Sequence, residues 1–241
     1  PSTPQPSTPQ PSTPQPSTPQ PPAANEGNSI IFNFGLATAG ANEATSIDGR
    51  VKIASHLNND KLKEPTGWTG AVIVDDGKKA MRTLSGVGTP GAASRYLEIT
   101  ELNIQSGSDT VIMVPFKITA GGNANGSPAS FIFAQNDATP VANWLLTATD
   151  GGFLAGAAAG YKIDGNIVGP ATLSKVYEYD KWHIAVLTKD MAFNKIRIGT
   201  NHVLSTWRNV VIGQGFRIIT GANKEGIDKL YNELKKEYGI A

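Results

Sequence analysis

The chain has 241 residues, 21 Lys and Arg against 20 Asp and Glu, a formal charge of +1, and only 17% charged residues. Without a basic block, few counterions would be released from a phosphate backbone, so nucleic acid is not expected as a partner. The absence of Cys excludes disulfides and cysteine-ligated zinc, and no apolar run approaches the ~20 residues that span a bilayer, so we expect no membrane insertion. The three His residues lie far apart in the sequence, and we predict neither a metal nor another cofactor.

The N-terminal segment differs sharply from the rest of the chain. Residues 1–20 are four perfect copies of Pro-Ser-Thr-Pro-Gln, Pro21 and Pro22 follow, and no charged residue precedes Glu26. Proline at two positions in five fixes φ and removes backbone donors, and a five-residue repeat presents no helical or strand face. We therefore assign residues 1–25 to an extended polyproline II arm and residues 26–241 to one globular domain.

The arm has two interpretations. One is a spacer between domains. The other is a bridge between subunits, because 22 residues at roughly 3.1 Å each reach about 68 Å, whereas the body has an expected radius of gyration of about 17 Å. If the arm is ordered, it extends past its own domain to another copy, and a head-to-tail contact that does not close into a ring grows into a filament.

The Ser-Thr pairs of the repeats are candidates for O-linked sugars, because Ser/Thr/Pro tracts carry such sugars in secreted stalks. An unmodified linker is the alternative. Since the sequence starts with Pro1, inside the repeat pattern, we expect a processed or truncated product. The candidate O-glycosylation positions are Ser2, Thr3, Ser7, Thr8, Ser12, Thr13, Ser17 and Thr18.

From Asn28 onward the sequence contains short β-type runs separated by Gly, Asn, Asp and Pro. Such runs with turns between them predict an all-β fold, an antiparallel jelly-roll β-sandwich. The predicted strands are Ser29–Phe34, Ala71–Asp75, Lys79–Leu84, Ser94–Asn103, Thr110–Thr119, Ala129–Gln135, Asn143–Thr149, Tyr161–Asp164, Trp182–Thr188, Asn194–Gly199 and Gly215–Thr220.

Two kinds of strand are expected within this set. The runs Val111–Val114 and Phe131–Phe133 are continuously apolar, as in central strands that are covered on both sides. In Tyr96–Leu102, neither of the two alternating faces is apolar throughout, which predicts a half-exposed or edge strand.

One helix is predicted, over Ala222–Tyr238, and Gly239 is a natural C-cap. Its solvent face is expected to carry two charge pairs, Glu225 with Lys229 and Glu233 with Lys236. The helix should pack its apolar stripe on the sandwich or close one end of it. That stripe has the three-four spacing of an amphipathic helix and contains Ile227, Leu230, Tyr231, Leu234 and Tyr238.

Three segments resemble a known superfamily. The runs Asp180–Asp190 (DKWHIAVLTKD) and Lys195–Gly199 (KIRIG) are similar to strands of concanavalin A-like, laminin G-like jelly rolls, and Ile227–Ile240 is similar to the helix that ends many bacterial and phage members. The resemblance implies the fold. It also implies that members often bind glycans on the concave sheet or at the loop rim, frequently with calcium, and that some are glycosidases. None of the functional residues of the family can be matched to a position here.

Two motifs with catalytic or nucleotide-binding spacing have simpler interpretations. Gly86–Gly91 has the spacing G-x-G-x-x-G, but Pro90 interrupts it and a strand-like run follows instead of a helix, so we interpret it as a loop. Glu178 and Asp180 could form the carboxylate pair of a retaining glycosidase, yet the third acid of an E-x-D-x-x-E run is replaced by His183. We therefore predict that the protein is not an enzyme.

Three further candidates are weighed in the same way. Asp75-Asp76-Gly77 could supply calcium ligands, but we favour a hairpin turn, because a calcium site needs several more oxygens nearby. We expect His183 to be a packed or surface side chain rather than a catalytic base. The sequon at Asn125 is weakened by Pro128, which follows it directly.

The four tryptophans could include a sugar-stacking platform, since an indole face suits the apolar face of a pyranose. Core packing is the default for most of them. The candidates for glycan contact are Trp68, in the loop 67–70, and Trp207 beside Arg208.

These observations favour a structural subunit of an extracellular fibre or appendage, located outside the cell or on a virion surface. In this interpretation the Pro-rich arm bridges neighbouring copies head to tail. The alternative is a carbohydrate-binding module of a phage tail fibre, an adhesin or a polysaccharide-acting protein.

Overall fold

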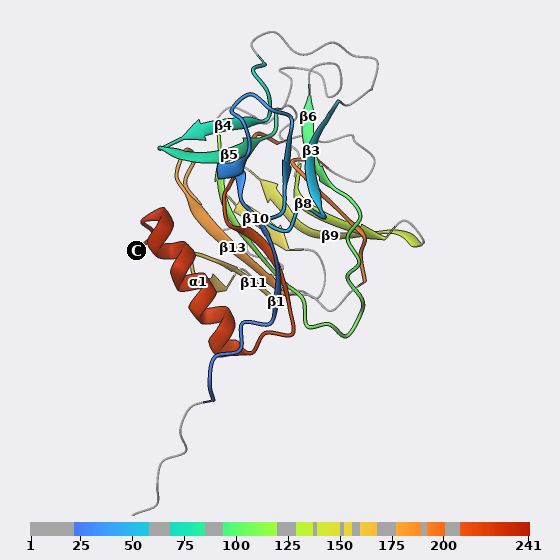
Figure 1. The fold of residues 1–241 in the computed structure, drawn as a ribbon, viewed down its shortest axis with the longest axis vertical. Coiled ribbons are helices and arrows are strands. Elements are labelled where there is room, and N and C mark those ends of the chain that lie inside the picture. Colours follow the sequence, from blue (N-terminus) through green and yellow to red (C-terminus); the bar gives the residue numbers. More distant parts are fainter. Residues whose placement is uncertain are drawn as a thin grey trace, which may run out of the picture.

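The computed structural model in Figure 1 describes residues 22–57, 68–84, 94–119, 129–136, 139–149, 152–155, 160–167, 177–188, 192–200 and 208–241. Two antiparallel sheets pack face to face, and a C-terminal helix covers the outer side of one of them. The fold is therefore the all-β jelly-roll sandwich with a C-terminal helix that the sequence predicts. Of the arm, residues 1–25, the structure describes only the last four residues, and residues 1–21 lie outside the described residues.

Sheet A has nine strands among the described residues, all paired antiparallel. The order is β12-β11-β13-β7-β15-β5-β4, and β16 lies between β7 and β1. The strands are β1 (Asn28–Phe32), β4 (Val72–Asp75), β5 (Lys78–Arg82), β7 (Val111–Ile118), β11 (Gly160–Ile163), β12 (Asn166–Ile167), β13 (His183–Thr188), β15 (Val210–Gly213) and β16 (Phe216–Thr220).

Sheet B has seven strands in the described part of the chain, in the order β10-β9-β8-β14-β6-β3-β2. Sequence analysis did not predict β2, β3, β10, β12 or β15; β2 and β12, of three and two residues, are too short for an alternating pattern. The strands are β2 (Glu43–Thr45), β3 (Lys52–Leu57), β6 (Arg95–Ile99), β8 (Ala129–Asn136), β9 (Thr139–Thr149), β10 (Gly152–Ala155) and β14 (Lys195–Ile198).

Strand β7 is the centre of the fold, and all eight of its residues are buried, as its apolar run predicts. Ile112 and Phe116 face the core between the sheets, whereas Val111 and Met113 face the helix on the outer side. Two strands share one edge of β7: β16 pairs with its first half and β15 with its second half. Residues 214 and 215 separate these two strands.

The prediction that Tyr96–Leu102 forms a half-exposed or edge strand is wrong. Strand β6 lies between β14 and β3, and all five of its residues are buried. The polar residue that disturbs its pattern, Glu98, is neutralised by Arg197, whose Nε donates to Glu98 Oε2 at 2.7 Å. An interior strand can therefore carry a carboxylate, because the neighbouring strand supplies the opposite charge.

Helix α1 (Lys224–Tyr238) begins two residues later than predicted, after Asn223 as N-cap, and ends at Gly239 with φ of +65°. Its apolar stripe packs on the outer face of sheet A, as predicted. The contact joins Leu230, Leu234 and Tyr238 to Val111, Met113, Ile184, Val186 and Ile219. No helix among the described residues is long and apolar enough to cross a bilayer.

The break between β15 and β16 accommodates the end of α1. A Cβ atom at Gly213 would lie 2.0 Å from Tyr238 Oη, so only glycine leaves room for this ring. The Tyr238 hydroxyl donates to the carbonyl of Gln214 at 2.8 Å, and burial raises the pKa of Tyr238 well above its ordinary value.

Candidate functional site

A pocket of about 440 Å³ lies at one end of the sandwich, where β1, β16 and two loops meet. We call it the rim pocket. Its volume lies within the range that small-ligand sites occupy. Its lining residues are Asn28, Ser29, Ile30, Asp48, Arg50, Asn103, Ile104, Gln105, Ser108, Ile218 and Thr220.

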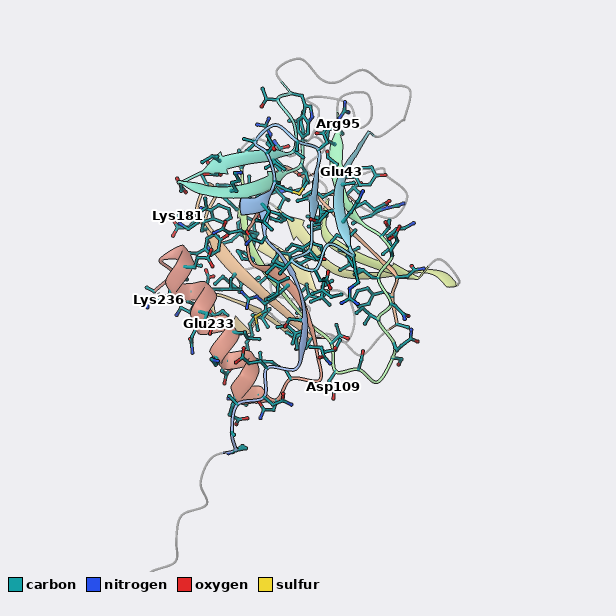
Figure 2. All side chains as sticks on the ribbon, viewed as in Figure 1. Glu43, Arg95, Asp109, Lys181, Glu233 and Lys236 are labelled. Carbon is teal, nitrogen blue, oxygen red and sulfur yellow. The ribbon has the colours of Figure 1, made fainter. Side chains whose placement is uncertain are left out.

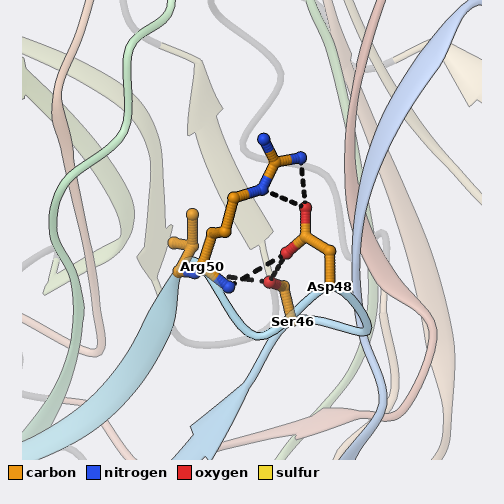
Figure 3. Close-up of polar contacts among 4 residues, drawn as sticks. Ser46, Asp48 and Arg50 are labelled. Carbon is orange, nitrogen blue, oxygen red and sulfur yellow. Dashed lines mark hydrogen bonds and ion pairs between the residues drawn. The ribbon is translucent and has the colours of Figure 1, made fainter.

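One wall of the rim pocket is the turn between β2 and β3, which Figure 3 shows. The turn is closed by a bond from Gly49 N–H to the Ser46 carbonyl at 2.9 Å, and Gly49 has φ of +74°, a conformation that favours glycine. Asp48 binds Arg50 in three ways: Oδ1 accepts from the backbone N–H at 3.1 Å, and Oδ2 accepts from Nε at 2.9 Å and from Nη2 at 2.6 Å.

The Asp48 carboxylate is held in its charged form. The Ser46 hydroxyl donates to Oδ1, and with the backbone and side-chain donors of Arg50 it lowers the pKa of Asp48 from 3.8 to about 2. The Arg50 side chain is 83% exposed and keeps further N–H donors beyond the two that Asp48 accepts. The turn therefore presents a fixed carboxylate and a guanidinium whose charges cancel.

The opposite wall is the loop after β6. Gln105 donates from its side-chain amide to Asn103 Oδ1, and Ser108 donates to the Gln105 carbonyl. The Gly221 N–H donates to the Ser108 carbonyl at 3.2 Å, which ties this loop to the segment before α1. Figure 2 labels Asp109, the next residue, at the end of the body where the chain enters.

The rim pocket combines two kinds of surface. The half-buried Ile30 supplies apolar contact, and the core residues Ile104 and Ile218 lie beneath it. Around them lie amide, hydroxyl, carboxylate and guanidinium groups, so donors and acceptors are both present. The pocket suits an uncharged, polar ligand that also carries apolar surface.

A second feature lies beside the rim pocket. Residues 23–27, which we call the arm root, are bound to the start of α1. Asn223 N–H donates to the Asn25 carbonyl at 2.9 Å, Asn25 N–H donates to Asn223 Oδ1 at 2.8 Å, and Asn223 Nδ2 donates to the Ala23 carbonyl at 2.8 Å. The same Asn223 Oδ1 caps the helix by accepting from Gly226 N–H at 2.9 Å.

Two further contacts fix the arm root. Lys229 of α1 forms an ion pair with Glu26, in place of the predicted pair with Glu225. The Asn25 carbonyl lies so close to α1 that a Cβ at Gly226 would be 2.0 Å from it. The chain therefore enters the body at a fixed position beside α1, as Figure 1 shows, and the rim pocket begins at the next residues, Asn28 and Ser29.

No protein-family model and no curated protein matches this chain. The resemblance to concanavalin A-like proteins therefore stays a prediction, and the residues themselves must carry the functional argument.

The tryptophan candidates lie outside the rim pocket. Trp68 is half-buried at the edge of the core, its Nε1 donates to Asn42 Oδ1 at 3.3 Å, and the Arg82 guanidinium lies 5.0 Å from its ring centre. Arg208 is 1% exposed, and its Nη2 donates to the hydroxyls of Tyr177 and Tyr179 at 2.9 and 3.1 Å. These contacts hold both side chains in the body, while Trp207 lies outside the described residues, so glycan contact by the three stays a prediction.

The Asp75-Asp76-Gly77 segment forms the predicted hairpin turn between β4 and β5, with φ of +50° at Asp76 and +72° at Gly77. Lys117 lies where a cation would be expected: its Nζ donates to Asp75 Oδ1 and to Asp76 Oδ2, both at 2.7 Å. Trp182 Nε1 also donates to Asp76 Oδ2, at 3.0 Å. Within the described residues, no group of three His, Cys, Asp or Glu side chains could hold a metal ion.

His183 is packed, as predicted, with 8% exposure. Its Nδ1 lies 2.6 Å from Asp164 Oδ2, and Glu178 N–H donates to its Nε2 at 3.0 Å. The Glu178 side chain forms an ion pair with Lys181, with 2.6 Å between Glu178 Oε2 and Lys181 Nζ. The imidazole therefore connects the turn after β11 to the start of β13.

The remaining candidates lie outside the described residues. They are the eight Ser and Thr positions of the repeats, the Gly86–Gly91 loop and the sequon at Asn125. Sequence analysis singled out none of the residues that line the rim pocket. The segment Ser46-Ile47-Asp48-Gly49-Arg50 has the composition of a turn, and it does not by itself indicate a ligand site.

Proposed function

We propose that this protein is a structural subunit of an extracellular fibre or appendage, in which the Pro-Ser-Thr-Pro-Gln arm of each copy binds the next copy head to tail. The observation that carries the proposal is the anchored arm root. A flexible spacer does not need a fixed point of attachment to its domain. A bridge between subunits binds more tightly with one, because an arm that starts from a fixed point loses less conformational entropy when it docks.

The composition of the arm supports the same proposal. Its four perfect repeats contain no charged residue, so copies of the arm do not repel one another. Polyproline II is already stiff, which further reduces the ordering cost of binding. O-linked sugars on the eight Ser and Thr positions would stiffen the arm more and protect it from proteases.

Negative-stain microscopy and analytical ultracentrifugation of the purified chain test this proposal, with a chain lacking residues 1–21 as the comparison. We expect the intact chain to form concentration-dependent assemblies and the truncated chain to stay monomeric. The proposal fails if the two chains sediment alike as monomers at high concentration.

The alternative function, a carbohydrate-recognition module, draws its support from the rim pocket rather than from tryptophans. Its lining groups can both donate to and accept from sugar hydroxyls. Glycan-array screening tests it, and binding that survives Trp68→Ala but is lost on Asn103→Ala would assign the pocket to a sugar.

A further inference from the structure

We infer that the rim pocket is the acceptor site for the Pro-Ser-Thr-Pro-Gln arm of a second copy of this chain. The inference rests on the proposed function and adds the partner surface that the proposed assembly needs. Three observations carry it: the position of the pocket beside the arm root, the length of the arm, and the chemistry of the lining residues.

The position of the pocket sets the distance that an arm must span. Asn28 and Ser29 line the pocket directly after the arm root, and Asn28 pairs with Thr220, also a lining residue. In a head-to-tail assembly, the distance from one arm root to the pocket of the next copy is therefore about one body diameter, roughly 40–45 Å.

The arm has the length for this span. The 21 residues before the described chain reach about 65 Å as polyproline II, and about 14 of them cover one body diameter. Residues 1–7 then remain to occupy the pocket of the next copy. Binding to the pocket of the same molecule would need a sharp reversal of a stiff segment directly before the fixed root, so the geometry favours the second copy.

The lining chemistry fits the arm. The arm offers carbonyl oxygens, hydroxyls and proline rings, and the two prolines of each five-residue repeat lack a backbone N–H. The pocket supplies donors through Arg50 and the side-chain amides of Asn103 and Gln105, and it supplies apolar contact through the half-buried Ile30. Since Asp48 cancels the charge of Arg50, the site is neutral overall, as the uncharged arm requires.

Titration of a fluorescently labelled peptide of residues 1–20 with the full chain tests the inference by anisotropy. We expect saturable binding that Arg50→Ala and Asn103→Ala each weaken at least ~tenfold. Lys52→Ala is the matched control, because Lys52 pairs with Glu43 outside the pocket, and it should bind like the parent chain. Thermal melts of all four proteins identify a variant that has merely unfolded.

The possible outcomes separate this inference from the proposed function. Peptide binding that the two pocket variants leave unchanged, or no saturable binding, overturns the inference. If both pocket variants still assemble through the arm in ultracentrifugation, the proposed function stands and the acceptor site lies elsewhere. If the pocket instead binds saccharides and the peptide does not compete, the site belongs to a glycan and the inference fails.

Discussion

Asn25 and Asn223 bind each other reciprocally: each backbone N–H donates to the other residue, that of Asn25 to Asn223 Oδ1 and that of Asn223 to the Asn25 carbonyl. The two residues are 198 positions apart, so the pair ties the entry of the chain to its last helix. One asparagine thus serves as helix cap and as anchor for the arm root, and the stability of α1 is coupled to the position of the arm.

Asn223→Ala removes both roles at once. Loss of an N-cap alone costs ~1 kcal/mol, and loss of the arm-root bonds should bring the decrease in the free energy of unfolding to about 1–2 kcal/mol. Urea denaturation measures it, and hydrogen exchange should show lost protection at Asn25. Asn232→Ala, at an exposed position of the same helix, is the control and should change little. Equal stability of the two variants would contradict the coupling.

Gly226→Ala tests the close approach of the arm root to α1. Within a helix, Ala is normally ~1 kcal/mol more favourable than Gly. Here the added Cβ would lie 2.0 Å from the Asn25 carbonyl, so we expect a less stable protein or a displaced arm root. Thermal unfolding and exchange of the Asn223 N–H measure the two effects. A variant with a higher melting temperature and unchanged protection would refute this packing.

Lys117 connects β7 to the β4–β5 hairpin through two carboxylates. Its side chain is only 8% exposed, so Lys117→Ala should leave Asp75 and Asp76 without their cation and remove buried packing, at a cost of about 1–3 kcal/mol. The exposed Lys162 gives the control, since Lys162→Ala should cost less than ~0.5 kcal/mol. Chemical denaturation of both variants measures the two changes in the free energy of unfolding, and equal changes would contradict the role of Lys117.

The pH dependence at Asp48 follows from its lowered pKa. The pKa is about 2 in the folded protein and 3.8 for the ordinary carboxyl, so the contribution of Asp48 to stability is complete above pH 3.8 and is lost as the pH falls toward 2. We expect Asp48→Asn to lack this part of the acid transition. Side-chain carboxyl shifts followed by NMR give the midpoint directly, and a midpoint near 4 would be incompatible with the hydrogen bonds of Figure 3.

The fold was largely predictable because its signals are local. The apolar run of β7 and the three-four spacing of α1 each specify burial within one segment, and Gly239 marks the helix end. Strand β6 was mispredicted because its burial depends on Arg197, which the sequence separates from Glu98 by 99 residues. The alternation of apolar and polar residues within one strand does not reveal an ion-pair partner that lies on another strand.

The candidate site was not predictable for the same reason. The rim pocket takes residues from β1, the turn 46–50, the loop 103–108 and β16, and none of these segments carries a binding motif alone. Trp68 was chosen as a glycan-contact candidate because of its residue type. In the fold its Nε1 donates to Asn42 and its ring contacts the Arg82 guanidinium. Lys229 likewise pairs with Glu26 across the fold, where helix spacing alone predicts Glu225.

Disulfide cross-linking between two variants tests the bridging arm most directly, because the chain contains no cysteine of its own. Gln5→Cys labels the part of the arm expected to dock, and Ser29→Cys labels the rim pocket with a residue of similar size. Mixed and oxidised, the two proteins should form a covalent heterodimer, whereas Asn232→Cys in place of Ser29→Cys should not. Equal cross-linking to both positions, or none to Ser29→Cys, would contradict an arm that binds the rim pocket of another copy.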